Sequence, residues 1–238
     1  MEGSTDITAA ILAGGLGRRL QPVVSDRPKV LAEVSGKPFL AYLLEQISSV
    51  GVRKAVICTG YMGDKIEECF GEAYESLGIV YSREDEPLGT GGALRLALPY
   101  LSSDIILVMN GDSYINTDLS VYVDWYFERK LQAALLLSLA DDTSRYGSVR
   151  INENKTVASF EEKCENSGPG WINAGIYLLR KSLISTIPAG RFYSLERDFF
   201  PKFMGSELYG FCVKGRFIDI GTPESYVTAQ KFFATEGF

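Results

Sequence analysis

Short apolar segments alternate with segments of helical periodicity over the first 140 residues or so, and this alternation limits the fold more than any other feature. The apolar segments are four to seven residues long, which is typical of buried strands, and lie at 8–13, 54–59, 79–82, 104–109 and 133–139. The intervening segments with helical features lie at 38–49, 63–70, 91–101 and 118–130. Strands that alternate with helices need right-handed crossovers, so we expect an α/β fold with a Rossmann-like, mostly parallel sheet flanked by helices.

The pattern changes in the second half, where a smaller mixed α+β region is expected. Segments 147–151 and 156–160 flank a polar turn and predict a hairpin. Further strands are expected at 171–179, 208–213 and 216–220, with helices at 194–204 and 223–233. Because no linker or shift in composition interrupts the chain, we expect one domain over residues 1–238, with halves of about 1–140 and about 141–238.

Composition excludes several classes of protein. The net charge is −6 with both signs spread along the chain, which argues against a nucleic-acid partner. No apolar run approaches the roughly 20 residues that span a bilayer, and the polar, acidic start does not resemble a signal peptide, so a cytoplasmic location is expected. The four cysteines are far apart and are expected to be thiols: Cys58, Cys69, Cys164 and Cys212.

The chain contains no histidine. This excludes Ser-His-Asp and Cys-His nucleophilic machinery and histidine-ligated zinc. Any chemistry must therefore use carboxylates, lysine, arginine, backbone amides and bound metal.

The loop after the first strand, LAGGLGRRL from Leu12 to Leu20, is the most informative stretch. Its glycines let backbone amides approach phosphate oxygens closely, and Arg19 is a better candidate than Arg18 for a bidentate phosphate contact. A plain glycine-rich turn with solvated basic residues stays open. A dinucleotide fingerprint would need a third glycine at Leu20, and the Gly-Lys-Ser/Thr of a P-loop is absent.

This loop, together with SDRPK from Ser25 to Lys29, resembles the signature of the sugar-phosphate nucleotidyltransferases. The resemblance implies that Gly14, Gly15, Gly17, Arg19 and Lys29 hold a nucleoside triphosphate. It also implies that Arg19 and Lys29 stabilise charge on the leaving pyrophosphate. The chain departs from the family at Val30 and Glu33, where prolines are common, and this affects the expected shape of the loop.

The stretch EPLGTGGA from Glu86 to Ala93 is a second match to that family. On structural grounds alone it could be a turn and helix start with Thr90 as the cap. The resemblance implies instead that backbone groups at Leu88, Gly89 and Thr90 read the nucleobase. Carbonyls of this loop and of the loop from Leu12 could accept hydrogen bonds from the N–H and amino groups of guanine.

Two aspartates follow predicted strands, Asp112 in NGDS and Asp219 in DIGTP. Each could be a turn residue, but open α/β sheets bind ligands at the carboxyl ends of strands. Mg²⁺ favours one or two carboxylates together with phosphate oxygens and water. We therefore expect the two aspartates to hold Mg²⁺, and the resemblance assigns the metal to the same pair, with Asp112 also catalytic.

For the second half, the resemblance implies contacts to the sugar and its phosphate. These fall on Glu162, Lys163 and Asn173, with weaker correspondence at Gly147 and Glu196. From composition alone, charged residues after a strand could equally form a solvated face. The first half is thus expected to bind nucleotide and the second half sugar 1-phosphate.

Among short members of the family, the chain looks most like the heptose 1-phosphate guanylyltransferases, which implies transfer from GTP to a heptose 1-phosphate for surface polysaccharide synthesis. Mannose 1-phosphate guanylyltransferases and muramate or hexose 1-phosphate uridylyltransferases stay open as alternatives. A non-catalytic nucleotide-sugar-binding subunit and an NAD-binding oxidoreductase are further alternatives. The oligomeric state also stays open, with a homodimer among the alternatives.

Overall fold

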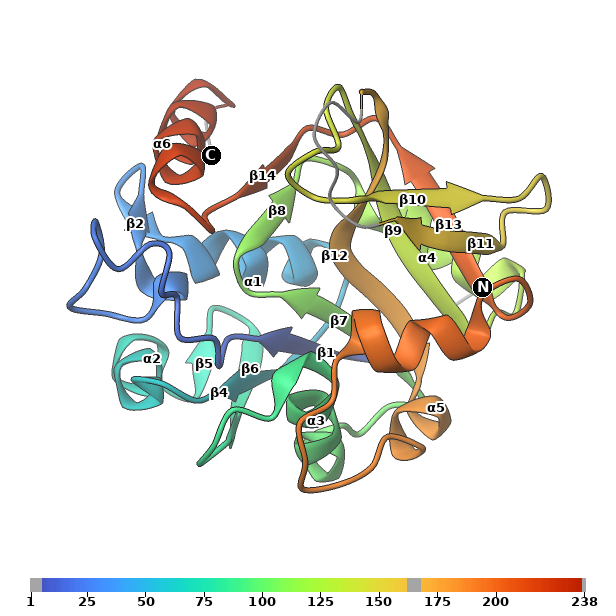
Figure 1. Ribbon diagram of the computed structural model, residues 1–238. Coiled ribbons are helices and arrows are strands. Elements are labelled where there is room, and N and C mark those ends of the chain that lie inside the picture. Colours follow the sequence, from blue (N-terminus) through green and yellow to red (C-terminus); the bar gives the residue numbers. More distant parts are fainter. Residues whose placement is uncertain (1–5, 162–167, 237–238) are drawn as a thin grey trace.

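The computed structural model describes residues 6–161 and 168–236. An eight-stranded sheet forms its centre, with strand order β13-β9-β12-β7-β1-β4-β6-β5 (Figure 1). Its strands are β1 (Ile7–Leu12), β4 (Lys54–Thr59), β5 (Ala73–Tyr74), β6 (Leu77–Arg83), β7 (Ile105–Asn110), β9 (Ala133–Ala140), β12 (Gly170–Arg180) and β13 (Leu208–Val213). Only β5 and β12 run against the other six, so the expected α/β fold with a mostly parallel sheet is confirmed.

Both faces of the sheet are buried, and alternate residues of one strand serve opposite faces. In β7, Leu107 and Met109 belong to one core, whereas Ile106 and Val108 belong to the other. The first core contains side chains of α1 (Phe39–Ser49), α2 (Gly63–Phe70), α4 (Leu119–Glu128) and α6 (Pro223–Glu236). The second contains α3 (Gly89–Leu96), α5 (Lys181–Ser185) and the helical turns η3 (Leu195–Phe199) and η4 (Phe200–Phe203). The result is three layers, which explains why the strands are continuous apolar runs.

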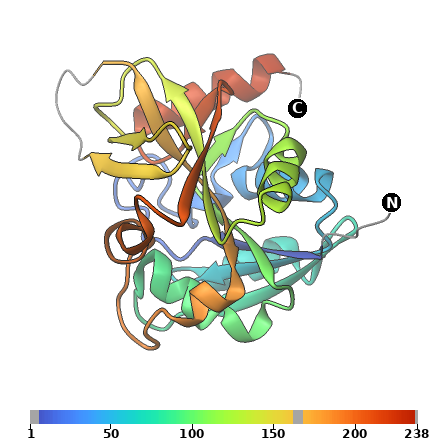
Figure 2. The ribbon, with the colours of Figure 1, turned by 90° about the vertical axis from the view of Figure 1, so that its right-hand side faces the viewer.

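Three small two-stranded sheets accompany the main sheet. They pair β10 (Ser148–Ile151) with β11 (Val157–Glu161), β14 (Phe217–Asp219) with β8 (Ser113–Ile115), and β2 (Glu33–Val34) with β3 (Lys37–Pro38). The first of these confirms the predicted hairpin. The β10–β11 hairpin lies at the opposite end of the molecule from α3 and α5 (Figures 1 and 2).

Two predicted helices differ from the structure, and in each the departure at the C-terminal part coincides with a proline. The expected helix at 194–204 is a π turn followed by a 3-10 turn, because Pro201 has no N–H with which to continue an α-helical ladder. The expected helix at 91–101 begins earlier, at Gly89, and α3 ends at Leu96 before the 3-10 turn η2 (Leu98–Tyr100), which contains Pro99. The turn η1 (Lys29–Leu31) and the two-residue strands were not predicted because they are too short for periodicity.

Two further expectations concern cysteines and membranes. Cys58, Cys69 and Cys212 are free thiols, and Cys164 lies outside the described residues. In the described part of the chain, no helix has the length and apolar character needed to cross a membrane.

Candidate active site

The carboxyl ends of four parallel strands meet at one edge of the sheet. Leu12, the last residue of β1, pairs with Cys58 of β4 on one side and with Asn110 of β7 on the other. The loops after β1, β6 and β7 consequently gather around a cavity of about 480 Å³. Predicted site residues that line it are Leu12, Gly14, Gly15, Gly17, Lys29, Gly89, Thr90 and Asp112.

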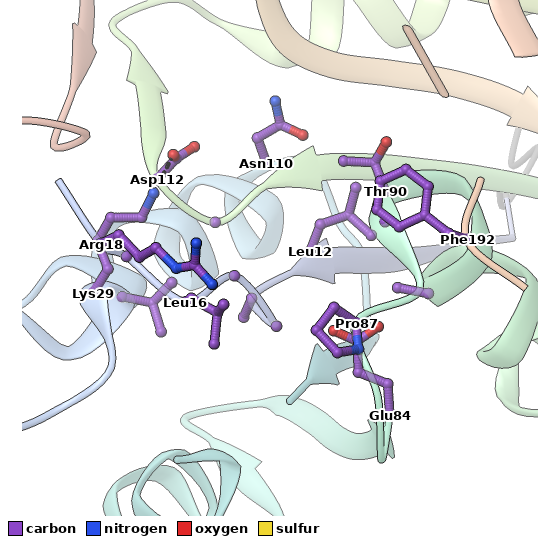
Figure 3. Close-up of a pocket in the computed structure, with 18 residues that line it drawn as sticks. Leu12, Leu16, Arg18, Lys29, Glu84, Pro87, Thr90, Asn110, Asp112 and Phe192 are labelled. Carbon is purple, nitrogen blue, oxygen red and sulfur yellow. Dashed lines mark hydrogen bonds and ion pairs between the residues drawn. The ribbon is translucent and has the colours of Figure 1, made fainter. Parts of the chain in front are cut away.

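The cavity has chemically different ends (Figure 3). Arg18, Lys29 and Asp112 lie at one end, whereas Pro87 and Glu84 lie at the other. Arg18 lines the cavity, although Arg19 was the favoured arginine. The Arg19 guanidinium lies instead near the loop after β14, 3.6 Å from where a Cβ on Gly221 would stand.

Close backbone approaches explain the glycines of this edge. A Cβ on Gly14 would stand 2.5 Å from Glu84 Oε1, and one on Gly111 would stand 2.8 Å from the Leu12 carbonyl oxygen. Gly17 has φ +61°, a conformation that L side chains rarely adopt. Gly15 faces open space, because a Cβ there would meet no atom within 4 Å outside its own chain neighbours. The loop is therefore folded tightly against β6 and β7 while part of its backbone stays accessible.

Lys29 and Asp112 form an ion pair in which the ammonium group donates a hydrogen bond to Asp112 Oδ2. Lys29 begins the 3-10 turn η1, and Asp112 lies between β7 and β8. The lysine side chain is 16% exposed and the aspartate side chain 33%. This pair places a cation and a carboxylate beside the glycine loop. Phosphates bound there would need the cation to balance their charge and the carboxylate to hold a metal ion.

The β8–β14 pair brings the backbone of the two predicted metal ligands together, because Asp112 directly precedes β8 and Asp219 ends β14. Asp219 lies opposite Ser113 in this ladder, and the Ile220 N–H donates to the Asp112 carbonyl oxygen at 2.9 Å. Residues 6–161 and 168–236 hold no cluster of three or more His, Cys, Asp or Glu residues that could bind a metal. Two carboxylates fit a Mg²⁺ ion that takes its remaining ligands from phosphates and water.

Predicted residues of the second half form a hydrogen-bonded group beside the cavity. Glu196 accepts hydrogen bonds from Thr90 Oγ1 (2.9 Å) and from the Tyr177 hydroxyl (3.3 Å), and Asn173 Nδ2 donates to that same hydroxyl oxygen (2.9 Å). Burial raises the pKa of Tyr177 well above its ordinary value, so it stays a neutral phenol. Gly175 has φ +73°, and it lies where the pairing of β12 with β9 shifts register.

The turn interpretation proposed that Thr90 caps α3, but the structure shows that it does not. Leu88 is the N-cap residue, and no side chain caps it. Thr90 Oγ1 instead accepts a hydrogen bond from the Leu195 N–H at 2.8 Å and so joins α3 to η3. Gly147, with φ +75°, ends a turn beside Asp219, whereas Glu162 and Lys163 lie outside the described residues.

The lining also contains residues to which sequence reasoning assigned no role, among them Glu84, Asn110 and Phe192. Glu84 Oε2 accepts a hydrogen bond from the Leu88 N–H at 2.9 Å. Burial raises the pKa of Glu84, and the Leu88 N–H acts in the opposite direction. Phe192 is 66% exposed. The position of Glu84 directly after a strand of the parallel sheet was a usable signal, whereas nothing local distinguishes Phe192.

Comparisons with known proteins agree with this geometry. The family described as nucleotidyl transferase matches residues 8–236. The D-glycero-alpha-D-manno-heptose 1-phosphate guanylyltransferase of Aneurinibacillus thermoaerophilus is 38% identical, over 94% of this chain and 96% of that relative. The mannose-1-phosphate guanylyltransferase of Mycobacterium tuberculosis is 34% identical, over 93% of this chain and 63% of that relative.

A solved structure, HddC from Yersinia pseudotuberculosis complexed with GMP-PN, is similar in fold, with a TM-score of 0.84. It is 37% identical, and the match covers 95% of this chain and 99% of that one. Because the family match spans nearly the whole chain and the relatives are aligned over most of their length, the chain belongs to the nucleotidyl transferase family and is an enzyme of that kind.

Proposed function

We propose that this protein transfers GMP from GTP to a sugar 1-phosphate, with a heptose 1-phosphate as the preferred acceptor. The observation that carries the proposal is a single cavity with a glycine loop, Lys29 and Asp112 at one end and the Glu84 carboxylate at the other. The first end suits a triphosphate, and the second suits a base that offers hydrogen-bond donors.

Glu84 supports guanine as the base. The ring N–H and the adjacent amino group of guanine form a donor pair that matches a carboxylate or backbone carbonyls. Adenine lacks this donor pair and would leave the half-buried carboxylate without its partner, which costs roughly 1–3 kcal/mol. The Leu88 N–H holds Glu84 Oε2, so the carboxylate is oriented before a nucleotide binds.

The reaction is an in-line displacement at the α-phosphorus. An oxygen of the sugar 1-phosphate forms the new bond while the bond to the β-phosphate breaks, and pyrophosphate leaves. The attacking oxygen is already ionised at neutral pH, so a chain without histidine needs no general base. Lys29 supplies positive charge where charge grows on the leaving group, and Arg19 is proposed to add to it from its position near Gly221, in the loop that follows Asp219. When bound by Asp112 and Asp219, Mg²⁺ would neutralise charge on the phosphates.

We propose that the acceptor binds beside Thr90, where Asn173 and Glu196 would offer an amide and a carboxylate to sugar hydroxyls. Gly147 is proposed to contact the sugar phosphate, together with Glu162 and Lys163. The relatives named above act on heptose and mannose 1-phosphates, and the relative with nearly complete length coverage supports the heptose. The product would be a nucleotide sugar for surface polysaccharide synthesis. We propose that the reaction takes place in the cytoplasm, where the nucleotide substrate is available. The binding partners are small molecules, and the protein is either a monomer or a homodimer.

A pyrophosphate-release screen tests this proposal. GTP, UTP, CTP, ATP and dTTP are each combined with heptose and mannose 1-phosphates, and specificity constants are compared. We expect the highest value for GTP with the heptose. A preference for UTP or dTTP contradicts the donor assignment, and a preference for mannose 1-phosphate contradicts the acceptor assignment.

A further inference from the structure

The Asp219 carboxylate is held by three hydrogen bonds, two from the segment that follows it and one from a distant turn. Oδ1 accepts from the Gly221 N–H (2.7 Å) and the Ser225 hydroxyl (2.8 Å), and Oδ2 accepts from the Tyr146 hydroxyl (2.8 Å). Arg145 lies 3.7 Å from Oδ2, which is too far for a hydrogen bond and adds charge only. A carboxylate has about four acceptor sites, so three are filled and one remains on Oδ2.

Ser225 holds Asp219 through the first turn of α6. Its N–H donates to Thr222 Oγ1 (3.2 Å), and its own oxygen accepts from the Thr222 N–H (3.0 Å), which makes a reciprocal capping box. This position usually carries glutamate or glutamine. A glutamate would place a second negative charge beside Asp219 and would have no proton to donate. Serine can accept from Thr222 and donate to Asp219 at once, and it is only 4% exposed.

Tyr146 reaches Asp219 from the turn before β10. Its ring packs edge-on against Phe217, with ring centroids 5.2 Å apart, and Phe217 is two residues before Asp219 on the same face of β14. The N–H groups of Tyr146 and Gly147 both donate to the Thr143 carbonyl oxygen, at 3.1 and 2.9 Å. The hydroxyl group therefore connects an ordered turn to the carboxylate.

Asp112 is held differently, because its side-chain partner is the Lys29 ammonium group. An arriving triphosphate can draw that lysine away and leave the carboxylate free to turn toward a cation. The partners of Asp219 are hydroxyl and amide groups fixed by a helix cap and a packed ring, so phosphate has no comparable attraction for them.

We propose that Tyr146 and Ser225 are positioning residues, which hold Asp219 so that Oδ2 presents one free lone pair to a divalent cation. This inference rests on the proposed function only in taking Asp219 as a metal ligand. Hydrogen bonds that orient a ligating carboxylate are typically worth 10–100-fold in metal affinity. Asp219 is accordingly a preset ligand through one oxygen, and Asp112 is an adjustable one.

Mn²⁺ binding to the full-length protein in the presence of a non-hydrolysable GTP analogue tests the proposal. Free Mn²⁺ is measured by electron paramagnetic resonance, so turnover is not needed. We expect Tyr146→Phe, which keeps the ring on Phe217, and Ser225→Ala each to weaken Mn²⁺ binding by roughly 10-fold or more. Tyr81→Phe is the matched control, because the Tyr81 hydroxyl donates to the Gly71 carbonyl oxygen on another part of the molecule.

Thr222→Ala separates positioning from a loss of helix stability. It removes the oxygen that caps the Ser225 N–H but keeps the Ser225 hydroxyl beside Asp219. We expect it to lower the melting temperature by roughly 2–4 °C and to leave Mn²⁺ affinity unchanged. Equal Mn²⁺ affinity in wild type and Tyr146→Phe overturns the proposal, and so does tighter binding, which would mean that the hydroxyl competes with the metal. Wild-type protein that binds no Mn²⁺ would instead contradict the metal site of the proposed function.

Discussion

The Lys29 ammonium group donates a hydrogen bond to Asp112 Oδ2, although 83 positions separate the two residues in the chain. The pair joins the segment after the glycine loop to the end of β7. Each partner neutralises the other, so a triphosphate must compete with Asp112 for the ammonium group. A divalent cation must likewise compete with Lys29 for the carboxylate. The proposed binding of triphosphate and metal at this pair would therefore begin with the exchange of ionic partners.

Lys29→Ala is expected to lower turnover by roughly 100-fold or more and to raise the Michaelis constant for GTP much less. The reason is that the charge on the leaving pyrophosphate grows in the transition state, where one preorganised donor contributes most. Steady-state kinetics with GTP and the accepted sugar 1-phosphate measure both constants. A raised Michaelis constant with unchanged turnover would mean that Lys29 only binds substrate.

Removal of the metal, or of either aspartate, is expected to abolish most of the activity. Asp112→Asn and Asp219→Asn keep side-chain size but lose the negative charge that a divalent cation requires. Pyrophosphate release is measured for each variant and for wild type in excess chelator, with Mg²⁺ restored as the control. Full turnover in chelator, or a fully active Asp219→Asn variant, would be inconsistent with the two-carboxylate site.

Glu84→Gln is expected to lower the specificity constant for GTP by roughly 10-fold or more while changing that for ATP little. The amide cannot accept both guanine donors as a carboxylate does, and a lost pairing of this kind costs about 1–3 kcal/mol. Glu86→Gln, an exposed position in the same loop, is the control. If Glu84→Gln and Glu86→Gln have the same specificity constant for GTP, Glu84 does not contribute to recognition of the base.

GTP binding is expected to weaken on acidification, at a higher pH than for an exposed glutamate. Burial raises the pKa of Glu84, so its protonated form persists to higher pH, and a protonated carboxyl accepts guanine donors poorly. The Michaelis constant for GTP should therefore rise as pH falls through that raised pKa. The Glu84→Gln variant should lack this rise, and a rise of equal size in both proteins would assign it to another group.

Gly175→Ala is expected to cost about 3 kcal/mol or more of unfolding free energy. Its Cβ would lie 2.7 Å from Ser113 Oγ and 2.8 Å from Asn110 Nδ2, so a collision adds to the unfavourable φ of +73°. Gly36→Ala is the control, since Gly36 has φ +89° with no atom within 4 Å of the built Cβ, and should cost about 1–2 kcal/mol. Urea unfolding compares the two variants, and equal losses would exclude the collision.

Local sequence patterns predicted the elements whose stability depends on their own residues. The bounds of β4 and α2 agree with those expected, because an apolar run and a glycine-bounded amphipathic segment define them. The placement of β12, antiparallel between β7 and β9, could not be read in the same way. That position depends on which strands pair with one another in the folded sheet. The residues of a single segment do not indicate which strands will lie beside it.

The candidate site divides along the same line. The sequence predicted the glycines, Lys29 and the two aspartates because the proposed chemistry requires particular residue types, and of these the glycines, Lys29 and Asp112 line the cavity. The acidic stretch Glu84–Glu86 offers three carboxylates, and only the fold turns Glu84 toward the cavity while Asp85 and Glu86 stay exposed. The partners of Asp219 were also hidden, since Tyr146 and Ser225 lie on separate segments that meet only when β14 pairs with β8.

The late position of β14 has a consequence for synthesis of the protein. All eight strands of the main sheet have been made once the ribosome has passed Val213, yet Asp219 has not. A nascent chain at that stage contains the strands, the glycine loop and Lys29, but it lacks Asp219 and the α6 side chains of the first core. The order of translation thus places a proposed metal ligand, and the α6 side chains of the first core, among the last parts of the protein to be made.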